Sequence, residues 1–178
     1  MITMLSRGAI SATVLLAVAF GAQAHTTLET QQATVSSTYK AVLRVGHGCD
    51  GAPTLKLRVR IPDGVINVKP MPKAGWEMET VNAPYEYKYD YHGTAVSEGV
   101  REIVWTGKLL DEHYDEFVFR AYLTDSLKPD TKLYFPLVQE CEGGKADRWI
   151  EIPADGESAD DYEHPAPGLK LLPARATH

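Results

Sequence analysis

Residues 54–62 read TLKLRVRIP, and this stretch decides the fold class. Apolar side chains occupy every second position (Leu55, Leu57, Val59, Ile61), and polar or charged side chains fill the positions between them up to Arg60. A period of two residues is that of a β-strand with one face in a core and the other in water. The stretch therefore predicts a half-buried strand.

The same kind of pattern recurs on both sides of this strand. Residues 39–45, 85–91 and 116–123 alternate in the same way, and shorter β-rich runs occur at 103–105, 132–138 and 149–152. Glycine, proline, aspartate or asparagine bounds these runs, and no convincing helical period interrupts them. Roughly seven to nine short strands at such spacing predict an all-β fold, an antiparallel β-sandwich of immunoglobulin or fibronectin type.

The first 24 residues have a different character. A single cation, Arg7, precedes an apolar run over residues 9–20, and Ala22-Gln23-Ala24 follows. This arrangement predicts a signal peptide cleaved after Ala24, and the apolar run is short for a membrane span. Cleavage would make His25 the N-terminus of an exported, periplasmic or secreted, protein. The alternatives are a retained anchor or cleavage a residue or two away.

Two cysteines, Cys49 and Cys141, fit an exported chain. An even count in an oxidising compartment favours a disulfide, which would bring the loop around His47 and Asp50 close to residues 140–149. The alternative is a pair of thiolate ligands, but two cysteines alone do not fill a tetrahedral soft-metal site.

The rest of the composition excludes several classes of partner. The chain has 24 acidic and 18 basic residues, which argues against nucleic acid and against an anionic membrane surface. No later apolar run is long enough to span a bilayer, so stable membrane insertion is not expected. From residue 154 the sequence becomes acidic and then proline-rich, so we expect a domain over 25–153 and an extended tail over 154–178.

A free N-terminal histidine has unusual ligand chemistry. Its α-amine and its ring Nδ1 can close a chelate on one metal ion, and nitrogen donors of these kinds suit Cu(II). His47 and Asp50, in the loop VGHGCDGAP over residues 45–53, are further candidates: an imidazole and a carboxylate. The alternatives are that His25 follows the cleavage site by coincidence and that Asp50 serves only a tight glycine-rich turn.

Four segments together resemble one family, the YcnI-like copper-binding proteins. They are HTTLE at 25–29, KAVLRVGHGCDGAPTLKLRVRIPDGV at 40–65, KPMPKAGWEME at 69–79 and CEGGKADRWIEIP at 141–153. The resemblance covers nearly all of residues 25–165. It implies an exported β-sandwich that binds Cu(II) through a monohistidine brace, with a carboxylate and a tryptophan nearby. Carried onto this sequence, these are His25, Asp50 and Trp149.

The chain departs from that pattern at HGCDG, residues 47–51, where a histidine stands beside the acid. This leaves open a two-histidine brace that includes His47. An indole NH only donates hydrogen bonds, so Trp149 would shield the metal and not ligate it in the ordinary way. The remaining histidines (His92, His113, His164, His178) are scattered, and we expect them on the surface.

The expected function is copper handling. No G-x-S-x-G, H-E-x-x-H or P-loop motif is present, so we expect a non-enzymatic Cu(II) chaperone or homeostasis factor. Its partners would be the copper ion and copper transporters or other periplasmic copper chaperones. The alternatives are a copper-dependent oxidative enzyme that uses both His25 and His47, and a metal-free binding module of the cell envelope.

Overall fold

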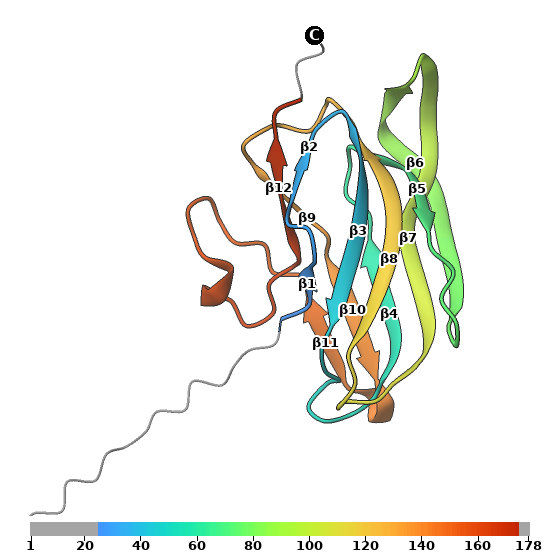
Figure 1. Cartoon of the computed structure of the whole chain (residues 1–178), viewed down its shortest axis with the longest axis vertical. Helices are drawn as coiled ribbons and strands as arrows, with labels where there is room; N and C mark the ends of the chain where they lie inside the picture. The colour runs from blue at the N-terminus through green and yellow to red at the C-terminus, as the bar shows by residue number, and fades with distance from the viewer. Residues whose placement is uncertain (1–24, 175–178) are drawn as a thin grey trace, which may run out of the picture.

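The computed structural model describes residues 25–174, so the predicted signal peptide over residues 1–24 lies outside the described part of the chain. The described part is built from strands and two single-turn 3-10 helices (Figure 1). In chain order these are β1 (Thr27–Leu28), β2 (Gln32–Thr34), β3 (Ser37–Val45), β4 (Thr54–Arg60), β5 (Val65–Pro70), β6 (Glu77–Tyr91), β7 (Thr94–Leu109), β8 (Asp115–Leu123), β9 (Lys132–Tyr134), β10 (Leu137–Cys141), η1 (Glu142–Gly144), β11 (Ala146–Trp149), η2 (Ala159–Asp161) and β12 (Gly168–Leu172).

The strands form two main sheets and one smaller sheet. One main sheet has the order β1-β3-β8-β5 and the other β11-β10-β4-β7-β6, while β2-β12-β9 form the third. Every pairing is antiparallel except that of β12 with β2. The predicted all-β antiparallel sandwich is therefore confirmed. No helix within residues 25–174 has the length and apolarity needed to cross a bilayer.

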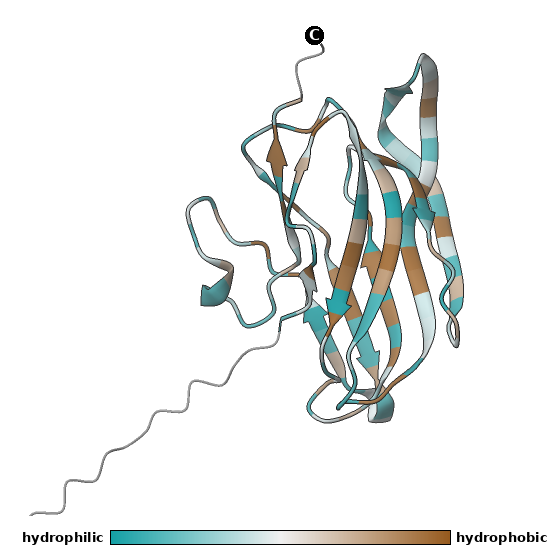
Figure 2. Cartoon of the chain, in the orientation of Figure 1, coloured by the Kyte–Doolittle hydropathy of each residue, from teal (hydrophilic) through white to brown (hydrophobic). Residues whose placement is uncertain are grey.

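The core lies between the two main sheets, and alternation along the strands fills it. Leu57, Val59 and Ile61 of the TLKLRVRIP stretch are fully buried, together with Trp105 of the neighbouring strand β7 and Phe117 of β8 in the opposite sheet. Figure 2 shows hydrophobic and hydrophilic residues following one another along these strands. Burial of a side chain of this size contributes about 1.5–3 kcal/mol, so these positions account for much of the driving force for the fold.

The start of β4 departs from the predicted alternation. The pairing of β4 with β7 shifts register between Thr54 and Lys56, and the pairing of β10 with β4 shifts between Glu140 and Cys141. A one-residue shift exchanges the two faces of a strand, so Thr54 is buried while Leu55 is only partly buried. The prediction that Leu55 lies on the buried face is wrong for this reason, and the shift places a hydroxyl group in the interior.

The fold continues further along the chain than the sequence suggested. Residues 154–167 make an excursion that includes η2, and the chain then returns as β12, between β2 and β9 (Figure 1). Leu169 and Leu171 of β12 are fully buried in the main core. The expected boundary at residue 153 and the extended tail are therefore wrong for the part up to Leu172, because a short apolar alternation follows the proline-rich run.

Candidate metal centre

Trp149 is the centre around which the candidate residues gather. It ends β11, opposite Leu137 of β10, and its side chain is only 3% exposed. His25 precedes β1, and His47 follows β3 in the loop that leads to β4. Residues far apart in the sequence thus meet at one edge of the sandwich.

Three imidazole rings contact the indole of Trp149 edge to face. The ring centroids of His25 and His47 lie 5.8 Å and 6.1 Å from that of Trp149. The centroid of His164 lies closer, at 5.0 Å. The structure therefore brings together His25, His47 and Trp149, as predicted, and adds His164, which the sequence analysis had placed on the surface without a role. The expectation that His164 is a scattered surface residue is wrong, because the excursion over residues 154–167 folds back onto β11.

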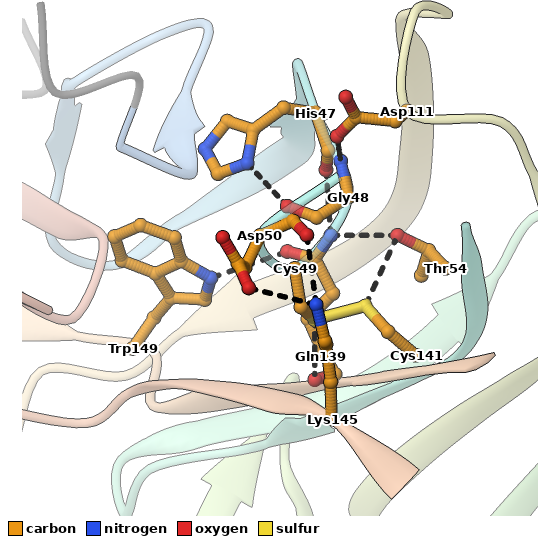
Figure 3. Close-up of a disulfide and its surroundings, with 10 residues drawn as sticks. All are labelled: His47, Gly48, Cys49, Asp50, Thr54, Asp111, Gln139, Cys141, Lys145 and Trp149. Atoms are coloured by element: carbon orange, nitrogen blue, oxygen red, sulfur yellow. Dashed lines mark hydrogen bonds and ion pairs between the residues drawn. A yellow bond between two sulfur atoms is a disulfide. The ribbon is translucent and has the colours of Figure 1, made fainter. Parts of the chain in front are cut away.

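A buried glutamine fixes the orientation of the indole. Trp149 Nε1 donates a hydrogen bond to Gln139 Oε1 at 3.3 Å, and Gln139 Nε2 donates to the His47 carbonyl oxygen and to Thr54 Oγ1, each at 2.6 Å (Figure 3). Gln139 is 1% exposed and stands at an inward position of β10. It ties the loop of His47 to Trp149, and the register shift in β4 supplies its hydroxyl partner.

Replacing Gln139 by leucine is expected to lower the free energy of unfolding by at least about 2 kcal/mol, because the indole NH and the His47 carbonyl lose their buried partner. Urea unfolding followed by tryptophan fluorescence measures the change. Glu140→Gln is the matched control: Glu140 pairs with Lys56 and Arg58 at the surface, at 3.9 Å and 3.5 Å, so a loss below about 1 kcal/mol is expected. Equal stability of Gln139→Leu and the unmodified protein would contradict the role assigned to Gln139.

The loop that carries His47 closes in a tight hairpin turn. Cys49 and Ala52 exchange two backbone hydrogen bonds of 3.0 Å, and the residues between them have positive φ, 47° at Asp50 and 77° at Gly51. Asp-Gly is a favoured pair for the type I′ turn, which needs positive φ at both positions. Before the turn, a Cβ on Gly48 would lie 1.9 Å from the Ala52 carbonyl oxygen, so the close approach requires glycine there.

The carboxylate of Asp50 is engaged by a neighbouring lysine. Lys145 Nζ lies 2.7 Å from Asp50 Oδ2 and also donates to the Asp50 carbonyl oxygen at 2.9 Å. This hydrogen bond and the positive charge of Lys145 lower the pKa of Asp50. The side chain is 91% exposed, so solvent screens the pair. The geometry gives Asp50 a direct role in the turn, and Lys145 engages only one of its two carboxylate oxygens, Oδ2.

The predicted disulfide is confirmed. Cys49 and Cys141 are bonded, with their Cα atoms 5.9 Å apart. The bond joins the hairpin turn to the end of β10, two residues beyond Gln139. Covalent and hydrogen-bonded links therefore hold the same loop against the same strand (Figure 3).

The nitrogens of the three imidazoles differ in their surroundings. His47 Nδ1 is hydrogen-bonded to the Gly48 carbonyl oxygen, which requires a proton on Nδ1 and puts the lone pair on Nε2. His25 Nε2 and His164 Nδ1 are buried and find no hydrogen-bond partner among the described residues. Buried polar atoms without a partner are uncommon in native proteins, and an ion or water is one explanation for them.

The donor set fits a metal held partly by a backbone group. Within residues 25–174, no three His, Cys, Asp or Glu side chains converge as a metal site made of side chains alone would require. A site at Trp149 must therefore draw a donor from elsewhere, and the α-amine that cleavage would create at His25 is such a donor. Imidazole and amine nitrogens are the donors that Cu(II) prefers, so the residues present fit copper.

Comparisons with known proteins identify a family and a fold. A family model described as "Domain of unknown function (DUF1775)" matches residues 25–171, so the match begins at His25. No curated protein matches the chain. Among solved structures, an uncharacterized protein from Nocardia farcinica with an immunoglobulin-like fold is similar, with a TM-score of 0.62 and 22% identity over 83% of this chain and 98% of that chain. This likeness supports the immunoglobulin-like arrangement of the sandwich.

Proposed function

This chain belongs to the DUF1775 family, and from that premise we propose that it is an exported Cu(II)-binding protein that uses its processed N-terminus, His25, as a chelating brace. The YcnI-like proteins fall in this family, so the resemblance is confirmed at the level of family and fold. Copper binding, the site residues and the periplasmic location are our proposal.

One observation carries the proposal. His25 is both the first residue of the matched family domain and a direct neighbour of Trp149, with two further imidazoles on the same indole. An N-terminal histidine placed by chance would have no reason to meet the tryptophan that the resemblance pairs with it. Its position follows from β1, whose Thr27 and Leu28 pair with Arg44 and Leu43 of β3.

The residues around the brace have separate tasks. After cleavage behind Ala24, His25 would supply its amine and one ring nitrogen to the same ion, which is the cargo of the protein. The indole N–H of Trp149 donates to Gln139, so the indole would shield the ion and not ligate it. His47 is the second imidazole that the sequence predicts, and Asp50 is the predicted carboxylate, whose Oδ2 is paired with Lys145.

The role we propose is copper handling without catalysis. A chaperone must release its ion, and a brace with few side-chain donors leaves coordination positions for an incoming ligand of the recipient. Copper transporters or other periplasmic copper chaperones would be such recipients. The acidic balance of the chain, with a net charge of −6, favours accumulation of cations near its surface.

Isothermal titration of Cu(II) into protein processed to begin at His25 tests this function. We expect one high-affinity equivalent. The variant His92→Ala is the matched control and should keep the same equivalent, because the His92 ring contacts Tyr91 and Tyr122 and not Trp149. Absence of a high-affinity equivalent in the processed protein would refute copper binding.

A further inference from the structure

The segment that carries His164 is fixed to β11 and not loosely attached. Glu151 donates its backbone N–H to the His164 carbonyl oxygen at 3.2 Å, and the His164 N–H donates to Glu151 Oε2 at 2.6 Å. Two residues further, Ala166 donates to the Glu151 carbonyl oxygen at 2.8 Å, and Pro165 between them forms a bridge with Glu151. Hydrogen bonds on both sides of His164 thus hold its backbone two residues beyond the tryptophan.

The ring of His164 packs against Trp149. It meets the indole of Trp149 at 5.0 Å and 82°, closer than either of the other imidazoles. The next three residues in the chain, Pro165, Ala166 and Pro167, are buried. A ring fixed by packing can present one nitrogen in a constant direction, which is the condition for a ligand that contributes affinity.

The nitrogen that this ring presents has no partner in the described protein. His164 Nδ1 is buried and makes no hydrogen bond there, and the same is true of His25 Nε2 on the same indole. Leaving one buried polar group without a partner costs about 1–3 kcal/mol, so His164 Nδ1 points to a ligand that the protein is built to receive, whereas His25 Nε2 is not the ring nitrogen that the chelate with the α-amine uses.

We propose that His164, through Nδ1, supplies the second imidazole to Cu(II) held at His25. This inference rests on the proposed function. His47 is the competing donor, because its Nδ1–H bond to the Gly48 carbonyl oxygen leaves the lone pair on Nε2, but its ring lies further from Trp149 than that of His164, at 6.1 Å against 5.0 Å. The amine and ring of His25 with the ring of His164 would give the ion three nitrogen donors from two residues. That count agrees with the absence of three converging side chains within residues 25–174.

Pulsed electron paramagnetic resonance of Cu(II)-loaded, processed protein counts coordinated imidazoles and tests the assignment. We expect two imidazoles in the unmodified protein, one in His164→Phe, which keeps an aromatic edge against Trp149, and two in His47→Gln, which removes the competing donor. The affinity of His164→Phe for Cu(II) should fall by about 10- to 100-fold or more. Circular dichroism checks that each variant is folded, and His164→Gln gives a second, more polar replacement should the phenylalanine not be accommodated.

The outcomes separate this inference from the function on which it rests. A spectrum and an affinity unchanged in His164→Phe or His164→Gln, while the unmodified protein binds one Cu(II), would overturn the role of His164 alone. Loss of one imidazole in His47→Gln with none lost at His164 would assign the second donor to His47 instead. Failure of the unmodified processed protein to bind Cu(II) would overturn both.

Discussion

A single methionine placed before His25 is expected to weaken Cu(II) binding by more than roughly 100-fold. The added peptide bond converts the α-amine of His25 into an amide, whose nitrogen can bind a metal only after losing its N–H proton, and the chelate ring formed by the neutral amine and Nδ1 is lost. Competition titration against a chromophoric chelator, on the processed and the Met-extended protein side by side, measures the ratio.

His25→Ala in the processed protein is the companion variant. It keeps a free amine but removes the ring, so its affinity should fall at least as far as that of the Met-extended protein. His25 precedes β1, but its ring contacts Trp149, so urea unfolding checks that both proteins keep the fold of the unmodified one. Equal Cu(II) affinities of all three proteins would place the copper site elsewhere.

Removal of the disulfide is expected to have the largest effect on stability. In the chain-entropy description, a bond that closes a loop of 92 residues stabilises the fold by roughly 4–5 kcal/mol. The double variant Cys49→Ala/Cys141→Ala should lose about that much free energy of unfolding in urea. It should also bind Cu(II) more weakly, because the turn after His47 then loses its covalent link to β10.

A reducing agent provides the matched control for this prediction. It should lower the stability of the unmodified protein to that of the double variant and leave the variant itself unchanged. A double variant within about 1 kcal/mol of the oxidised protein would show that the bond constrains the unfolded chain far less than its loop length implies.

The fold class could be predicted from the alternation of apolar and polar residues alone. The individual positions at which this prediction failed have local causes. Leu57, Val59 and Ile61 lie in the core as the period of two requires, because one face of β4 packs on the opposite sheet. Leu55 fails because a register shift changes the face, and such shifts depend on the partner strands, which a single stretch of sequence does not contain. β12 was missed because Leu169 and Leu171 form a very short apolar alternation after a proline-rich run.

Those residues of the candidate centre that a local sequence feature or the family resemblance marks could be predicted. His25 followed from the cleavage pattern, the disulfide from the cysteine count, and Trp149 from the resemblance. The role of Gln139 was not predictable. A glutamine at an inward position only breaks the apolar alternation of a strand, and its three hydrogen-bond partners come from other parts of the chain. His164 depends on the return of the chain after residue 154, which tertiary contacts determine.

The central claim is that the α-amine of His25 binds Cu(II), and one measurement addresses it most directly. Protein processed to begin at His25 and labelled with ¹⁵N only at the α-nitrogens of histidine is loaded with Cu(II) and studied by electron-nuclear double resonance. The account predicts a strong ¹⁵N coupling, because the only histidine α-nitrogen that is an amine is a ligand, and it predicts that this coupling disappears in the Met-extended protein. A processed protein that binds Cu(II) without that coupling, or identical spectra from both proteins, would contradict it.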